Sequence, residues 1–199
     1  MIPGWPTVLR HGALELRPLT RRDAATWRRL HESNRRWLQP WEATVPRGTG
    51  QAPQTYKRLV SSLRRQARDG RAMPFVICYE GTMVGQLTVA GITWGSARWA
   101  QVGYWIAESH AGRGLTTLAV AMAVDHCFGP VGLHRIEIAI RPENAASLRV
   151  VDKLGFDRIG LSAAYLHIDG AWRDHLLFAM TVEQANGSLV ARVASAADV

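Results

Sequence analysis

The sequence predicts an α+β protein with a mixed, twisted sheet of about seven strands and helices on both faces. The first observation is the order of its segments, since apolar runs of strand length alternate with runs of helical periodicity as βααβββαβαββ. The second is composition: 199 residues, of which 47% are hydrophobic and 20% charged, suit one globular domain with a sizeable core. We expect that domain to span residues 1–185, and residues 186–199 to form a loose tail.

The N-terminal third predicts one strand and two helices. After a first strand at residues 14–19, Thr20 caps the first helix, with Asp23 in the capping-box position. Residues 34–51 contain several prolines and glycines, so they predict a loop with short turns at most. Pro53 is expected to open the second helix, because proline is favoured in the first helical turn.

The rest of the chain predicts strands separated by two further helices. The strands follow from alternating or continuous apolar runs at residues 74–79, 83–92, 98–107, 134–140, 156–167 and 172–181. One helix covers residues 117–128. The other runs to Leu154, and Gly155 ends it at the C′ position.

A glycine turn, Ser-His-Ala-Gly-Arg-Gly-Leu-Thr, joins the strand before residue 109 to the helix after residue 116. A helix N-terminus exposes unpaired N–H groups at the positive end of the helix dipole, and this arrangement binds phosphate or pyrophosphate. Gly112 and Gly114 allow close approach, and Arg113 can add charge. The dinucleotide fingerprint G-x-G-x-x-G and the phosphate loop G-x-x-x-x-G-K-[ST] are both absent. The turn indicates a pyrophosphate-bearing cofactor, or else only a tight connection.

A second block, Asn144-x-x-Ser147 followed by Lys-Leu-Gly-Phe at residues 153–156, favours the cofactor site over a tight connection. Together with the glycine turn, this block resembles the GCN5-related N-acetyltransferases (GNAT). The pairs Tyr-Trp at 104–105 and Arg-Gly at 113–114, and Asp-Gly-x-Trp-x-Asp-His at 169–175, look like the branch that acetylates ribosomal-protein N-termini. The segment Trp-Leu-Gln-Pro-Trp-Glu at 37–42 is similar to the subgroup acting on N-terminal alanine. The resemblance covers roughly residues 12–183.

The resemblance implies a GNAT fold, in which a mostly antiparallel sheet splays between its fourth and fifth strands around acetyl-CoA, with no metal. It implies that the end of the fourth strand pairs with the pantetheine arm and that backbone amides of the glycine turn hold the pyrophosphate. The cofactor-binding residues so implied are Trp105, Ile106, Ala107, Ala111, Gly112, Arg113, Gly114, Leu115, Thr116, Asn144, Ser147 and Arg149. Asn144 also suits a plain helix N-cap.

The reaction implied is direct attack of a neutral amine on the thioester. An α-amine has a pKa of ~8 against ~10.4 for lysine, so an N-terminal acceptor needs only a weak base or a water relay. Ser147 is expected to protonate the departing thiolate, with Tyr165 as the alternative. Glu108, Glu42 and Tyr104 are the other catalytic candidates. Each carboxylate is equally well explained as a solvated charge.

The acceptor is expected to lie against the loop that carries Trp37, Trp41 and Glu42, where two large aromatic side chains can shape a cleft. Asp174 and His175 are further candidates for the acceptor site or for the base. They lie mid-strand, so at least one must point inward, and a buried pair that orders the strands is as good an explanation.

Charge is unevenly distributed along the chain. Residues 17–71 hold fourteen Lys and Arg against four Asp and Glu, a balance of +10, whereas the remainder holds ten against twelve. This pattern fits a solvated arginine-rich surface, or a basic face for an acidic partner such as ribosomal RNA. Cys78 and Cys127 are expected to be small core residues in a reducing cytoplasm. We expect no membrane segment, no signal peptide, and a monomer or homodimer.

Three hypotheses follow. The leading one is an acetyl-CoA-dependent acetyltransferase for the N-terminus of a ribosomal protein, with alanine preferred. The second keeps the fold and co-substrate but acetylates a free amino acid, polyamine or aminoglycoside. The third is a binding module for acyl-CoA or RNA that has lost catalysis, and the complete glycine turn with Asn144 and Ser147 argues against lost cofactor binding.

Overall fold

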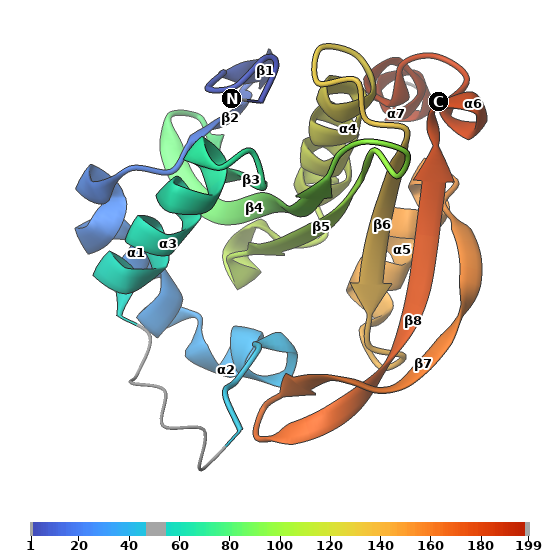
Figure 1. Ribbon diagram of the computed structural model, residues 1–199. Helices are drawn as coiled ribbons and strands as arrows, with labels where there is room; N and C mark the ends of the chain where they lie inside the picture. Colours follow the sequence, from blue (N-terminus) through green and yellow to red (C-terminus); the bar gives the residue numbers. More distant parts are fainter. Residues whose placement is uncertain (1, 47–54, 198–199) are drawn as a thin grey trace.

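The computed structural model describes residues 2–46 and 55–197, and within them an eight-stranded sheet runs through the molecule (Figure 1). The strand order is β1-β2-β3-β4-β5-β6-β8-β7, and only β5 and β6 are parallel neighbours. The strands are β1 (Leu9–His11), β2 (Leu14–Pro18), β3 (Ala72–Tyr79), β4 (Thr82–Thr93), β5 (Trp99–Ile106), β6 (Arg135–Ile140), β7 (Asp157–Ile168) and β8 (Ala171–Thr181). The predicted fold class is confirmed.

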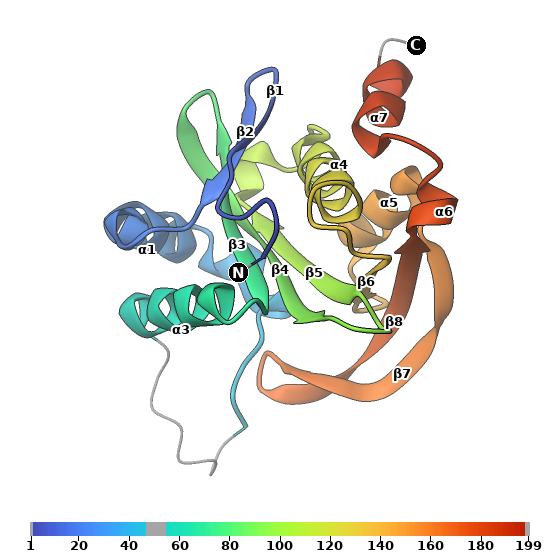
Figure 2. The ribbon, with the colours of Figure 1, turned by 45° about the horizontal axis from the view of Figure 1, so that its top comes forward.

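Helices cover both faces of the sheet, with α1 and α3 on one face and α4, α5 and α7 on the other (Figures 1 and 2). The α-helices are α1 (Ala24–Ser33), α2 (Arg35–Leu38), α3 (Tyr56–Arg68), α4 (Leu115–Phe128), α5 (Ala145–Leu154), α6 (Val182–Ala185) and α7 (Leu189–Ala197). Short 3-10 turns are η1 (Arg21–Asp23), η2 (Gln39–Trp41) and η3 (Glu108–His110). No helix in the described ranges is long and apolar enough to cross a membrane.

The sheet has one strand more than the sequence predicted. The additional strand, β1, pairs antiparallel with β2, and Leu9 lies opposite Leu16. Its three residues are too short to show the alternation that identifies a strand. Only the pairing with β2 makes this segment a strand.

The helices near the N-terminus begin where capping side chains place them. The Thr20 N–H donates to Asp23 Oδ2 at 2.8 Å, as a capping box requires. Helix α3 begins at Tyr56, because the Thr55 hydroxyl accepts the Arg58 N–H. Pro53, the expected start of this helix, lies outside the described residues.

Two apolar cores hold the layers together. Helix α4 lies in the larger core and is buried on nearly every side, including Ala119, Val120 and Ala123, so it is apolar all round. A smaller core between α1, α3 and β3 contains Val60 and Val76, both fully buried. Helix α4 is therefore held rigidly, and its N-terminus has a fixed position.

The expectation of a loose tail is wrong for residues 189–197, which form helix α7 against α4 (Figure 2). Asp125 on α4 accepts the N–H groups of Leu189 at 2.8 Å and Val190 at 3.1 Å, and Leu189 is fully buried. Arg192 donates to the Leu154 carbonyl at 2.7 Å. The capping carboxylate lies far upstream, so the tail sequence alone gives no sign of it.

The parallel pair β5 and β6 separates partway along its length. Residues 99–101 of β5 pair with residues 135–137 of β6, but β5 continues to Ile106 and β6 to Ile140. Beyond the paired stretch, the two strands no longer bond to each other. The predicted splay of these strands is present, and it opens the sheet toward the N-terminal ends of α4 and α5.

Candidate active site

A cavity of about 580 Å³ lies where β5 and β6 separate, between the N-terminal ends of α4 and α5 and the segment α1–η2. Most of the site residues predicted from sequence line it. These are Trp37, Trp41, Glu42, Tyr104, Trp105, Ile106, Ala111, Gly112, Gly114, Leu115, Thr116, Asn144, Ser147 and Arg149. Ala107, Glu108, Arg113, Asp174 and His175 do not line it.

The glycine turn forms one end of the cavity. Gly112 and Gly114 have φ angles of +75° and +76°, a conformation that side chains with a Cβ adopt at a cost. The first hydrogen bond of α4 runs from the Leu118 N–H to the Gly114 carbonyl, so the amides of residues 115–117 have no partner within the helix. These amides, at the positive end of a buried helix, fit a diphosphate group.

The positive side chains at this end come from α5 rather than from the turn itself. Arg149 and Lys153 both line the cavity. Arg113 instead lies 4.8 Å from the Tyr79 ring centroid and donates to the Tyr79 hydroxyl at 3.3 Å. The structure therefore directs Arg113 away from the cavity.

Asn144 and Ser147 open α5 at the side of the cavity. The Asn144 side-chain oxygen accepts the Ser147 N–H at 3.0 Å, so Asn144 is an N-cap and also lines the cavity. The Ser147 hydroxyl lies near the buried Tyr104 hydroxyl and interacts with it electrostatically, but no hydrogen bond of ordinary geometry joins the Tyr104 hydroxyl to another described residue. Burial raises the pKa of Tyr104 to about 12, and Ser147 acts in the opposite direction. A buried hydroxyl left unpaired here fits a polar group brought by a ligand.

The end of β5 is tied to the opposite wall. The Ile106 carbonyl accepts the Trp37 indole N–H at 3.0 Å, so it points away from β4 and toward the split. The Ala107 N–H donates to the Val84 carbonyl at 2.8 Å, so this amide already belongs to the sheet ladder. Of the two backbone groups, only the Ile106 carbonyl is directed to where an extended ligand arm would lie.

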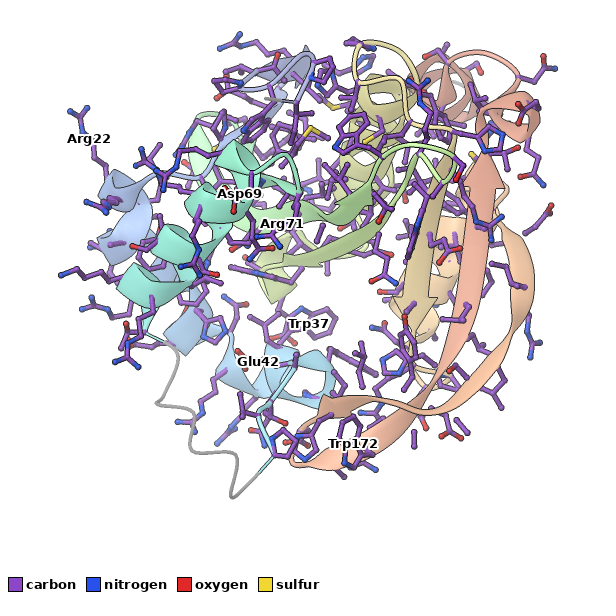
Figure 3. The ribbon with its side chains drawn as sticks, viewed as in Figure 1. Arg22, Trp37, Glu42, Asp69, Arg71 and Trp172 are labelled. Carbon is purple, nitrogen blue, oxygen red and sulfur yellow. The ribbon has the colours of Figure 1, made fainter. Side chains whose placement is uncertain are left out.

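The wall opposite the glycine turn is aromatic. In Figure 3, Trp37 and Glu42 lie between the α2 segment and the sheet, whereas Trp172 lies out on the β7–β8 hairpin. Arg141, directly after β6, donates to the Pro40 carbonyl at 2.6 Å, and its guanidinium lies 5.5 Å from the Trp41 ring centroid. These contacts fix turn η2 to β6, so Trp41 has a defined position in the wall.

Glu42 is paired with a residue that the sequence analysis did not assign to the site. His31 Nε2 lies 2.9 Å from Glu42 Oε1, and both residues line the cavity. The hydrogen bond from His31 is the main cause that lowers the pKa of Glu42, against an opposing effect of burial. Trp27 and Gln86 also line the cavity. The i, i+4 spacing of Trp27 and His31 is the one signal that could have suggested a shared face.

The remaining candidates have other contacts. The Glu108 N–H donates to the Asn34 side-chain oxygen at 2.8 Å, and Glu108 itself is exposed. Asp174 accepts the Ala164 N–H at 2.8 Å and supports the irregular part of β7. His175 is buried and points inward, and burial is the main cause that lowers its pKa. Tyr165 accepts a hydrogen bond from Gln101 at 3.0 Å.

No group of three or more His, Cys, Asp or Glu side chains in residues 2–46 and 55–197 is arranged to hold a metal ion. Cys78 and Cys127 are free and buried.

Comparison with known proteins identifies the family. Residues 13–157 match the acetyltransferase (GNAT) domain, so the chain belongs to the GNAT acetyltransferase family. Enzymes of this class transfer an acetyl group to an amine, and acetyl-CoA is the co-substrate. The unpaired amides, the α5 cations and the orphaned Tyr104 hydroxyl fit that co-substrate.

Three relatives place the chain more closely. The structure of Mycobacterium smegmatis RimJ in complex with CoA-disulfide is 44% identical, with a TM-score of 0.90, and covers 99% of this chain and 98% of that chain. The Escherichia coli [ribosomal protein uS5]-alanine N-acetyltransferase is 30% identical over 80% of this chain and 83% of its own length. The "Probable N-acetyltransferase YjcK" of Bacillus subtilis is 36% identical, but that match spans 49% of this chain and 54% of the relative.

Proposed function

We propose that this enzyme acetylates the α-amine of a ribosomal-protein N-terminus, with alanine as the preferred first residue. The names of the similar enzymes support this acceptor. The single observation that carries the proposal is the aromatic wall of Trp37 and Trp41, which faces a glycine-turn cradle across one cavity. Such an acceptor would place the reaction in the cytoplasm.

In this proposal, some groups of the chain bind the co-substrate and others transfer protons. The amides of residues 115–117 and the cations of α5 hold the diphosphate end of the co-substrate, which supplies an activated acetyl thioester. The neutral acceptor amine attacks the thioester carbonyl, and Ser147 delivers a proton to the departing sulfur. An α-amine, with a pKa of ~8, is neutral in about a tenth of its molecules at pH 7, so the demand on a base is small.

A small cationic acceptor, such as a polyamine, fits this cavity less well. Within the described residues, Glu42 and Glu143 line the cavity, and each is paired: Glu42 with His31, and Glu143 with Arg141 at 3.2 Å. Arg149 and Lys153 add positive charge to the same cavity. Both carboxylates are therefore engaged and neither is free to bind a polycation, whereas a peptide with one ammonium group needs fewer such partners.

The acceptor class is tested with peptides that begin with Ala, Ser or Met, an Nα-blocked lysine peptide and an aminoglycoside. We expect kcat/KM to be highest for the alanine peptide and lowest for the blocked lysine peptide. Faster acetylation of the blocked lysine peptide or of the aminoglycoside would overturn the acceptor and leave the family assignment intact. Mass spectrometry of the products locates the acetyl group.

We also propose that a basic layer, formed by the exposed cations of η1, α1, α2 and α3, contacts ribosomal RNA near the acceptor. Its members are Arg21, Arg22, Arg28, Arg29, Arg35, Arg36, Lys57, Arg58, Arg64, Arg65 and Arg68. Arg22 extends outward from this layer in Figure 3. The exposed large apolar side chains of the described chain lie on other elements, so this layer favours a polyanion over an apolar protein surface.

The double variant Arg64→Glu/Arg65→Glu tests this contact, with Arg158→Glu on β7 as the control outside the layer. We expect the double variant to lose RNA affinity and to acetylate ribosomal particles more slowly, while its rate with a free peptide stays unchanged. Wild-type RNA binding should weaken steeply as salt rises. Equal RNA affinity in the double variant and the control would overturn the contact.

A further inference from the structure

His31 is held in a fixed orientation at the mouth of the cavity. Its ring stacks on Trp27, one helical turn earlier on α1, with centroids 4.6 Å apart and an interplanar angle of 9°. Trp27 is fixed in turn, because its indole N–H donates to the buried side-chain oxygen of Gln86 at 2.9 Å. Gln86 also donates to Thr88 at 3.2 Å. Through Gln86 and Trp27, these contacts fix the imidazole relative to the sheet.

Glu42 and Trp105 are the other neighbours of the His31 ring. His31 Nε2 lies 2.9 Å from Glu42 Oε1, and the Trp105 ring stands edge-on to the imidazole with centroids 6.0 Å apart. All three residues line the same cavity. With Nε2–H donated to the carboxylate, the imidazole Nδ1 has a free lone pair, and none of the hydrogen bonds among the described residues uses it.

His31 and Ser147 lie on opposite sides of the sheet. Neighbouring residues of a strand point to opposite faces, so Tyr104 and Trp105 diverge. Tyr104 meets Ser147 on the side of α5, and Trp105 meets Trp27 on the side of α1, with ring centroids 6.3 Å apart. The split between β5 and β6 joins the two sides. Ser147 would then be available to the sulfur of a thioester held in the split, and His31 to an amine that approached from the other side.

We propose that His31 is a catalytic residue that takes the proton from the acceptor's α-ammonium group, and that Glu42 is a positioning residue that holds the imidazole. Trp105 forms an aromatic side of this subsite, next to the stack of His31 on Trp27. The inference rests on the proposed acceptor, because it concerns how that amine becomes nucleophilic.

The protons balance as follows. The α-ammonium gives one proton to His31, and the neutral nitrogen forms the C–N bond while the C–S bond breaks. The nitrogen then loses its second proton to water, while the Ser147 hydroxyl gives a proton to the sulfur and is reprotonated by water, so that one proton is released to solvent overall. The products are the acetylated amine and a free thiol, and His31 releases its proton to solvent.

The titratable groups that face the imidazole are few. Glu42 contacts it directly, Arg35 on α2 acts on Glu42, and Tyr56 on α3 packs behind Trp27 with ring centroids 5.1 Å apart. The neighbours contributed by β4 and β5, Gln86 and Trp105, carry no charge. Glu42 is therefore the charged side chain among these neighbours that contacts the imidazole.

The test compares His31→Gln with His134→Gln. His134 forms an ion pair with Glu183 at 3.1 Å outside the cavity, so it is a matched histidine–glutamate pair with no part in the site. At pH 7 about a tenth of an α-amine with a pKa of ~8 is already neutral, so we expect kcat/KM for the alanine peptide to fall by up to about 10-fold in His31→Gln and to stay within about twofold in His134→Gln. The deficit of His31→Gln should shrink as pH rises past ~8, because the amine then loses its proton unaided.

A second measurement does not depend on turnover. In NMR spectra of the enzyme with a non-reactive CoA analogue, the His31 ring signals should shift when the alanine peptide is added, and the His134 signals should not. A loss of kcat/KM in His31→Gln that does not depend on pH, or His31 ring signals that do not shift when the peptide is added, would overturn the proposal for His31. Failure of the wild type to acetylate any α-amine would instead overturn the proposed acceptor.

Discussion

Replacing Gly112 by glutamate puts a negative charge beside the place where we propose that the diphosphate of the co-substrate binds. The residue has φ +75° and no atom within 4 Å of a built Cβ, so a side chain fits but the backbone is strained. That strain costs roughly 1–2 kcal/mol and falls equally on any residue with a Cβ. Gly112→Gln therefore serves as the matched control of equal size and strain.

The difference between the two variants isolates the charge. Two unit charges about 5 Å apart repel by about 1 kcal/mol in water and about 3 kcal/mol at an effective dielectric constant of about 20. Gly112 is exposed, so we expect a value between these limits and a Kd for CoA at least ~10-fold weaker in Gly112→Glu than in Gly112→Gln.

Isothermal titration calorimetry with CoA measures both affinities, and circular dichroism confirms that both variants fold. The difference in CoA affinity between the two variants should narrow as the salt concentration rises, because screening weakens the repulsion. Equal affinities in the two variants at low salt would refute the assignment of the glycine turn to the diphosphate.

Further predictions concern turnover and stability. Ser147→Ala should lower kcat more than CoA affinity, and a loss of affinity alone would make Ser147 only a capping-turn residue. Tyr104→Phe removes a buried hydroxyl without a partner, so Tm should stay level or rise while kcat falls; a lowered Tm would contradict this. Asp125→Ala should cost about 1 kcal/mol and expose α7 to proteolysis without changing kcat. Burial lowers the pKa of His175 below its unfolded value of ~6.5, so the folded protein disfavours the protonated imidazole. The free energy of unfolding is therefore highest above that pH and falls as the pH drops. In urea titrations, His175→Gln should lose less of its free energy of unfolding on acidification than the wild type.

Local rules of the chain predicted those parts of the fold and site that depend on near neighbours. The Asn144 cap, the Gly155 helix end and the left-handed glycines of the turn are each decided within a few residues. The succession of strands along the chain followed from apolar patterning for the same reason. These features could be read without knowing what they pack against.

Features decided by distant partners could not be predicted in this way. The pair of His31 with Glu42 depends on how α1 meets the loop after η2, and α7 depends on a carboxylate in α4. Asp174 is equally instructive, because an isolated strand does not reveal that its side chain supports an irregular turn of β7. A charged residue near a motif has many potential partners, and only the folded chain selects one.

The hydrogen bond from Trp37 to the Ile106 carbonyl connects two parts of the cavity that we propose bind different substrates. If a pantetheine amide used this carbonyl in place of the indole, Trp37 would be released and the aromatic wall would change before the peptide bound. Linkage between two ligands is reciprocal, so any factor by which the first substrate changed the affinity for the second would apply equally in return. The bond would then give the enzyme a means of ordering its substrates.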